Sequence, residues 1–328
     1  KAVLLVSMLR AAGIEAWPAY GNGDMTDLLE ETVPAPAQFD RVMVHVPGFF
    51  TDSTFVNPIY GEAGRHGLWL HPTAQYNRYG YHNRGQGSRA LVVMESGGTL
   101  HRVKEFPPEK SLSLVRADFA LSDNGDLAGA FSAATDGLFD IQARMSLKDD
   151  TPRERQQYFS QAANAINEGT MVTDVELSNL RDLTEAAGLR FEFSAPELGL
   201  VQGNMMILHL PGPPFGFTAL PYFPDQESRE YEFVADGPFT LVREYSIGLP
   251  PGWDVAYMPE HETFACEHGR WMIDCTRSGN TLHLRRSLTV DASSVGTGGY
   301  PEFRRFFLGF TLPRQSLILL ERSESSGS

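Results

Sequence analysis

The chain has little cysteine, little positive charge and no long apolar run, and each shortage excludes a class of protein. Its two cysteines, Cys266 and Cys275, are too few for a disulfide framework and do not identify a redox compartment. It has 27 lysines and arginines but 41 aspartates and glutamates, so the formal net charge of -14 would repel a nucleic-acid backbone. The longest apolar runs, such as Ala2 to Val6 and Leu317 to Leu320, fall far short of the roughly 20 residues of a membrane span. We therefore expect neither nucleic-acid binding nor a membrane span.

What the chain does contain is typical of a folded protein with more than one domain. Hydrophobic residues make up 42% of the chain and charged residues 21%, a composition that can bury a sizeable core. At 328 residues the chain exceeds the usual size of a single hydrophobic core, so we expect two or three domains. The apolar pattern from Lys1 to Gly13 is typical of a helix closed by glycine, but no capping residue precedes it. We expect the sequence to be a fragment whose first helix begins upstream.

The first 97 residues are expected to form an α+β unit. Their patterns predict one helix followed by three strands, at residues 1–12, 14–20, 41–46 and 69–70. One helix packed on an antiparallel sheet is the economical arrangement of these elements. Residues 98–110, which contain the pair Pro107-Pro108, predict a linker after this unit.

Strand patterns dominate after the linker. Residues 111–224 predict a β-rich domain with one helix at about 151–168, opened by a capping box that starts at Thr151. Residues 225–322 alternate strand and turn patterns and predict an antiparallel β-sandwich module. The Ser/Gly-rich end, residues 323–328, is expected to be a tail. The expected fold class is therefore an α+β core followed by mainly β, sandwich-like modules.

Four short motifs in the first 97 residues occur in an informative order. They are Lys1-Ala-Val-Leu-Leu5, Leu9-Arg-Ala-Ala-Gly-Ile14, Phe39-Asp-Arg-Val42 and Trp69-Leu-His-Pro-Thr73. Their order and spacing resemble the core of bacterial transglutaminase-like proteins, especially the envelope group in which β domains of unknown function flank that core. Two weaker motifs, Ile247 to Val255 and Tyr300 to Phe307, are similar to the C-terminal β modules of the same group. The resemblance implies that the α+β core is a transglutaminase-like remnant.

The positions that would carry the chemistry of this family hold other residues. The resemblance places the catalytic Cys ahead of Lys1, the catalytic His at Arg41 and the catalytic Asp at His71. A thiol nucleophile needs a base to activate it and a carboxylate to orient that base. A guanidinium stays protonated and cannot accept a thiol proton, and His71 brings no fixed negative charge. We therefore expect no catalytic residues and a protein without the activity of the family.

The same positions predict a possible anion-binding pocket. His45 should share a strand face with Arg41 because side chains alternate along a strand, and the resemblance places His71 on a neighbouring strand. Arg41, His45 and His71 would then gather positive charge. The alternative is that Arg41 pairs with a local acid, such as Asp40 or Glu62, and that His71 satisfies a backbone group.

No metal or cofactor is expected. The C-terminal half holds four residues of the types that bind zinc: His261, Cys266, His268 and Cys275. If His268-Gly269 is a two-residue hairpin turn, Cys266 faces Trp271 and Cys275 lies roughly 13 Å further along the strand. That separation is too long for a shared metal ion or a disulfide.

The sequence thus predicts a catalytically inactive transglutaminase-like protein that acts as a binding or scaffolding component. Its partner would be an unidentified protein, peptide or glycan, and the resemblance implies a periplasmic or otherwise extracytoplasmic location. Two alternatives stay open. One is a cysteine-dependent acyltransferase or protease-like enzyme completed by residues before Lys1, and the other is a carbohydrate- or peptide-binding β module. The sequence names neither the ligand nor the oligomeric state.

Overall fold

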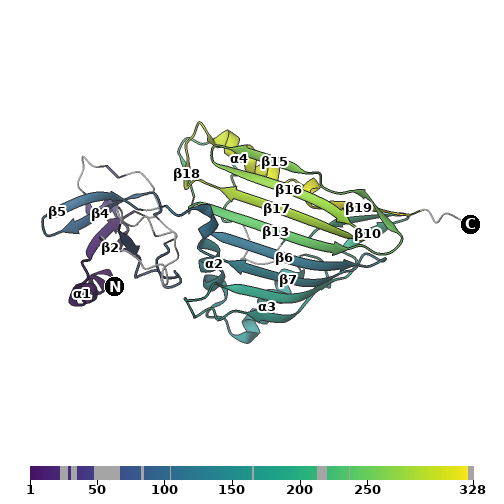
Figure 1. Ribbon diagram of the computed structural model, residues 1–328, viewed down its shortest axis with the longest axis horizontal. Helices are drawn as coiled ribbons and strands as arrows, with labels where there is room; N and C mark the ends of the chain where they lie inside the picture. The colour runs from purple at the N-terminus through teal and green to yellow at the C-terminus, as the bar shows by residue number, and fades with distance from the viewer. Residues whose placement is uncertain are drawn as a thin grey trace, which may run out of the picture.

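The computed structural model describes residues 1–22, 29–30, 35–47, 67–82, 85–103, 105–164, 166–212, 220–235 and 237–323. Within these residues the strands form four sheets, of five, four, two and eight strands. Figure 1 shows two bodies side by side, which we call the N-terminal unit (residues 1–103) and the large unit (residues 105–323). The expected tail lies outside the described residues except for Ser323.

The N-terminal unit is built on the five-stranded sheet. Its strands are β1 (Trp17–Gly21), β2 (Arg41–Val46), β3 (Leu68–Leu70), β4 (Arg89–Met94) and β5 (Gly97–Arg102). They pair antiparallel in the order β3-β2-β1-β4-β5. The strand predicted at 41–46 is confirmed, since β2 spans those residues. A short 3-10 helix, η1 (Pro36–Gln38), precedes β2.

One helix, α1 (Ala2–Ala11), lies against β1 and β2 of this sheet. Only two of its residues are buried, and they join a small cluster made of Ala2, Val6, Ala16, Val44, Val46 and Leu68. Three large apolar residues of the helix, Val3, Leu4 and Met8, are exposed. The helix therefore buries a narrow stripe and covers only part of one sheet face.

The large unit is organised by the eight-stranded sheet. Its strands are β6 (Leu112–Leu121), β7 (Leu127–Thr135), β8 (Met171–Leu177), β9 (Gly188–Ala195), β13 (Phe239–Gly248), β15 (Glu262–Cys266), β16 (Gly269–Ser278) and β17 (Thr281–Val290). Their order is β15-β16-β17-β13-β6-β7-β9-β8, and β6 with β13 is the parallel pair among antiparallel neighbours. Buried and exposed residues alternate along β6. One face of the sheet therefore meets the core and the other meets solvent.

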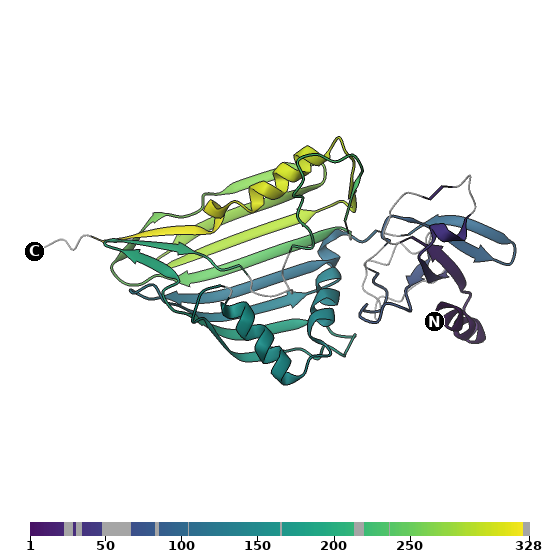
Figure 2. The ribbon, with the colours of Figure 1, turned by 180° about the vertical axis from the view of Figure 1, so that it is seen from behind.

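The buried face is covered by helices and a smaller sheet, as Figure 2 shows from behind. The covering elements are α2 (Leu138–Leu147), α3 (Pro152–Asn164), α4 (Tyr300–Phe310), β10 (Gly199–Gln202), β11 (Met205–His209), β14 (Trp253–Tyr257) and β19 (Leu317–Arg322). Residues of the helices and of both sheets share one hydrophobic core. The remaining elements are short: η3 (Pro108–Lys110), η4 (Pro313–Ser316), β12 (Phe233–Val234) and β18 (Ser294–Val295).

The predicted fold class is wrong. The described chain is mostly β and carries several sheets, and α1 buries too little to form the expected helix-on-sheet core. Strand pairing also crosses the expected boundary between the two β modules, because β6 pairs with β13 in parallel from Leu112↔Thr240 to Ala120↔Gly248. Strands of the segments 111–224 and 225–322 thus share one sheet. The domain boundaries themselves stay a prediction.

Two helices of the large unit show where local patterns succeeded and failed. The capping box before α3 is confirmed: Thr151 N donates to Glu154 Oε2 at 2.7 Å, and Glu154 N donates to Thr151 Oγ1 at 3.3 Å. By contrast, α4 was not predicted; it is an amphipathic helix that contacts β15 and β16.

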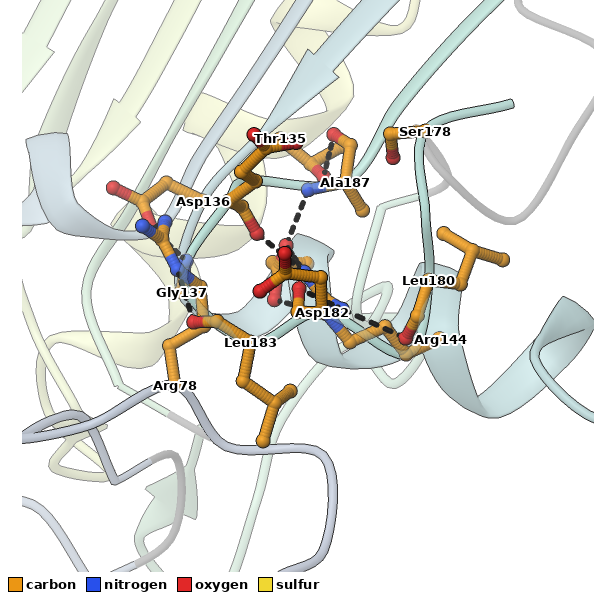
Figure 3. Close-up of polar contacts among 12 residues, drawn as sticks. Arg78, Thr135, Asp136, Gly137, Arg144, Ser178, Leu180, Asp182, Leu183 and Ala187 are labelled. Carbon is orange, nitrogen blue, oxygen red and sulfur yellow. Dashed lines mark hydrogen bonds and ion pairs between the residues drawn. The ribbon is translucent and has the colours of Figure 1, made fainter. Parts of the chain in front are cut away.

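The two units are joined by polar contacts around Arg78, drawn in Figure 3. Its guanidinium donates to Asp136 Oδ1 at 3.0 Å, to the Thr184 carbonyl at 3.2 Å and to the Leu183 carbonyl at 3.4 Å. A buried hydrogen bond of 2.7 Å between the Tyr81 and Ser111 hydroxyls lies nearby. Because these partners belong to the large unit, the loop that follows β3 is fastened to it.

Among the described helices, none combines the length and the apolar character that crossing a membrane requires.

Candidate functional site

Arg41 opens β2 and is held by its neighbour in sequence. Its Nε donates to Asp40 Oδ1 at 2.8 Å and its Nη2 donates to Asp40 Oδ2 at 3.1 Å, with the Arg41 side chain only 10% exposed. This is the bidentate geometry that suits a guanidinium and a carboxylate. One of the two acids expected as partners is therefore in place, and the other, Glu62, lies outside the described residues.

Arg41 lies on the face of the sheet opposite α1. A Cβ at Gly21, the pairing partner of Arg41, would lie 2.9 Å from Met43 Cε and 3.6 Å from Arg41 Cγ, so these two side chains share a face. Met43 packs in a core with Trp69, whereas the α1 cluster contains Val44. The alternation along β2 therefore places Arg41 away from the helix.

His45 follows on the same face as Arg41 and is buried. Its ring centroid lies 4.7 Å from that of Trp69 and 5.3 Å from that of His101. The two-residue period thus predicted its face correctly. Its surroundings are aromatic, which makes His45 a packing residue of the sheet as well as a candidate ligand.

His71 follows β3 and interacts electrostatically with both Arg41 and Asp40. Its pKa is lowered from the ordinary value of 6.5, first by burial and then by the Arg41 guanidinium, while Asp40 opposes the shift. Two buried nitrogens here, His71 Nδ1 and Trp69 Nε1, make no hydrogen bond to the described residues. The structure therefore brings Arg41 and His71 together, next to ring nitrogens that no described residue satisfies.

The lowered pKa of His71 gives a titration that can be measured. In a ring-proton NMR titration, the His71 pKa should fall below 6.5, and Arg41→Gln should raise it only part of the way back because burial is the larger cause. Since the folded-state pKa lies below the unfolded-state value, the neutral ring contributes stability that is present above about pH 6.5 and lost as the pH falls through the folded pKa. A folded-state pKa at or above 6.5 would contradict this placement of His71.

The cysteines lie in the large unit, on β15 and β16. Burial raises the pKa of both thiols, that of Cys275 to about 11, so neither is poised as a thiolate. The expected hairpin register is wrong by two residues: Cys266 faces Gly269 instead of Trp271, and Cys275 faces Leu284. Both thiols are unbridged.

Nearby, His261 Nδ1 lies 3.0 Å from Asp274 Oδ1. The described residues contain no group of three or more His, Cys, Asp or Glu suited to a metal ion.

Comparison with known proteins gives a family match for part of the chain and similarity to solved structures. A family model described as a domain of unknown function with solved-structure structure, DUF3858, matches residues 204–320. The chain is similar to the crystal structure of a putative protease from Parabacteroides distasonis, at 14% sequence identity and a TM-score of 0.49. That alignment covers 98% of this chain and 43% of the other, so this chain spans less than half of its neighbour. No curated protein matches the chain.

Proposed function

We propose that this chain is a catalytically silent relative of the transglutaminase-like proteins that acts by binding a partner. The ordered motifs from Lys1 to Thr73 support the relationship. The observation that carries the proposal is the bidentate Arg41–Asp40 pair, because it fills the position of the catalytic base with a group that stays protonated. His71, at the position of the orienting carboxylate, carries a lowered pKa and no negative charge.

The proposed binding surface is the sheet face that carries Arg41, His45 and His71. The buried Trp69 Nε1 donor, which makes no hydrogen bond to the described residues, supports an acceptor group such as a carboxylate at this place. Asp40 already offsets part of the Arg41 charge, so an acidic ligand would share or replace that carboxylate. The family resemblance supports a protein, peptide or glycan partner outside the cytoplasm.

An activity assay tests the proposal. Purified protein at its full natural length should give no amine incorporation into glutamine peptides and no amide hydrolysis above the buffer rate, because Arg41 cannot accept a proton. Arg41→His alone should stay inactive too, since it supplies a base without an orienting carboxylate. An active cysteine transglutaminase under the same conditions provides the positive control.

The opposite outcome is equally definite. Turnover by the unmodified protein that thiol alkylation abolishes would contradict the proposal and favour the alternative of a cysteine-dependent enzyme. In that case Arg41→Ala should also lower the rate if this surface carries the chemistry.

A further inference from the structure

A cavity of about 790 Å³ lies on the part of the N-terminal sheet that α1 leaves uncovered. Its floor comes from β1, β4 and β5, and its wall from η1 and described residues on either side of it. The described residues that line it are Tyr20, Leu29, Glu30, Ala35, Pro36, Gln38, Phe39, Leu91, Val93, Gly98, Thr99 and Leu100. Sites of roughly 300–1,000 Å³ are typical for small-molecule ligands.

Four hydrogen bonds hold the wall of the cavity in place. Two join Glu30 to Gln38 within the wall, and two join the wall to residues of or next to the sheet. Glu30 N donates to Gln38 Oε1 at 2.6 Å, and Gln38 Nε2 donates to the Glu30 carbonyl at 3.1 Å. Asn22 Nδ2 donates to the Gln38 carbonyl at 3.1 Å, and Arg89 Nη2 donates to the Leu29 carbonyl at 3.1 Å. The shape is therefore held before any ligand arrives, which lowers the entropy cost of binding.

The lining is apolar, with two aromatic rings. Tyr20 and Phe39 lie with ring centroids 6.1 Å apart at an interplanar angle of 57°, an arrangement that can contact a third ring. Tyr20 and Val93 are 37% and 36% exposed, so apolar surface here meets water that a ligand would displace. Among the described lining residues, Glu30 brings the charge, and it is negative. The Arg89 guanidinium, 3.1 Å from the Leu29 carbonyl, puts a positive charge beside this negative one, so a neutral ligand is favoured over an ion.

We propose that this cavity binds a small apolar molecule that contains a ring and carries no negative charge. The cavity and the Arg41 surface lie on opposite faces of the sheet. Ala19 and Val92 pack with Met43, which shares the Arg41 face. Tyr20 and Leu91 are the next pair along the same two strands, so their side chains point to the other face. The cavity thus indicates a class of ligand, which the sequence alone did not. The ring of the ligand lies against Tyr20 and Phe39, and its body lies over Leu91 and Val93.

A fluorescence titration with N-phenyl-1-naphthylamine, a neutral apolar probe, tests this site. The unmodified protein should show saturable one-site binding. Tyr20→Ala removes one of the two aromatic rings of the lining and should weaken the probe affinity at least fivefold, and Val93→Trp fills the cavity and should weaken it at least tenfold. The same changes at exposed positions of similar type, Tyr79→Ala and Val234→Trp, serve as matched controls and should stay within twofold.

The outcomes separate this site from the proposed function. Absence of saturable binding, or equal affinity in Val93→Trp and Val234→Trp, would overturn the cavity as a ligand site and leave the turnover assay unaffected. If Tyr20→Ala changes the thermal midpoint, the Val93→Trp comparison decides alone. A sulfonated analogue, 1-anilinonaphthalene-8-sulfonate, should bind more weakly than the neutral probe, and tighter binding of the anion would contradict the charge argument.

Discussion

Arg144→Met is expected to lower the free energy of unfolding by about 3–5 kcal/mol, because it leaves a buried carboxylate without its counter-charge. Arg144 is 0% exposed and Asp140 1% exposed, and two hydrogen bonds of 2.8 and 3.1 Å join them. The guanidinium also donates to the carbonyls of Leu180, Asp182 and Glu185. Figure 3 shows this side chain reaching from α2 into the loop before β9. Its removal also takes one hydrogen-bond donor away from each of these three carbonyls.

Urea denaturation followed by circular dichroism measures the loss of stability. Arg181→Met is the matched control, since Arg181 is 73% exposed and lies 3.8 Å from Asp149, and it should change stability by less than about 0.5 kcal/mol. The double variant Arg144→Met/Asp140→Leu should recover part of the loss, because no buried charge is left. A cost below about 1 kcal/mol for Arg144→Met would show that water reaches Asp140 in the folded protein.

Local elements were the predictable part of this fold. β2 has valine, a β-branched residue, at every second position from Val42 to Val46. α3 begins where the hydroxyl of Thr151 and the carboxylate of Glu154 lie three residues apart. Both signals act over a few residues, so the sequence states them directly.

The joining of strands into one large sheet could not be predicted in the same way. β6 and β13 pair in parallel although they lie far apart in the chain, and each reads as an ordinary strand by itself. Which strands become neighbours depends on how their buried faces fill a shared core, and a single sequence does not record that choice. For this reason the sequence did not predict that strands of the segments 111–224 and 225–322 share one sheet.

α4 carries a helix signal in the sequence that was not used to predict it. Tyr300, Phe303, Phe307 and Phe310 recur at spacings of three and four, and Pro301 stands in the first turn. That period places the aromatic residues on one helix face, and proline is favoured where a helix begins. The spacing therefore indicates a helix, which the sequence interpretation did not name.

The two candidate sites differ in how much of each could be predicted from the sequence. Asp40 is adjacent to Arg41 in the chain, so the sequence alone offers their pairing as one of the alternatives for Arg41. The cavity over β1, β4 and β5 was not predicted, because its floor and its wall come from segments separated in the chain. No single motif marks such a place, and its apolar residues resemble ordinary core residues.

Phe303→Ala is the second change with a large expected effect, a loss of about 3–5 kcal/mol in the free energy of unfolding. Phe303 is buried at the centre of an aromatic cluster and lies within 6.5 Å, ring centroid to centroid, of the residues Tyr222, Phe233, Phe306, Phe307 and His268. The cluster fixes α4 on β15 and β16, where the Phe306 carbonyl also accepts a 2.9 Å hydrogen bond from Trp271 Nε1. Removing the ring leaves a cavity that these rigid neighbours cannot close.

The same substitution at an exposed ring provides the comparison for this effect. Phe223 is exposed, so Phe223→Ala should change the urea midpoint little, whereas Phe303→Ala should lower it strongly with an unchanged slope. Phe303→Leu keeps most of the volume and should cost less than half as much as Phe303→Ala. Near-ultraviolet circular dichroism should lose intensity in Phe303→Ala because the aromatic rings and Trp271 lose their fixed packing. Equal costs at positions 303 and 223 would mean that α4 does not pack on the sheet in solution, and the shared core between the helix and the eight-stranded sheet would then have to be abandoned.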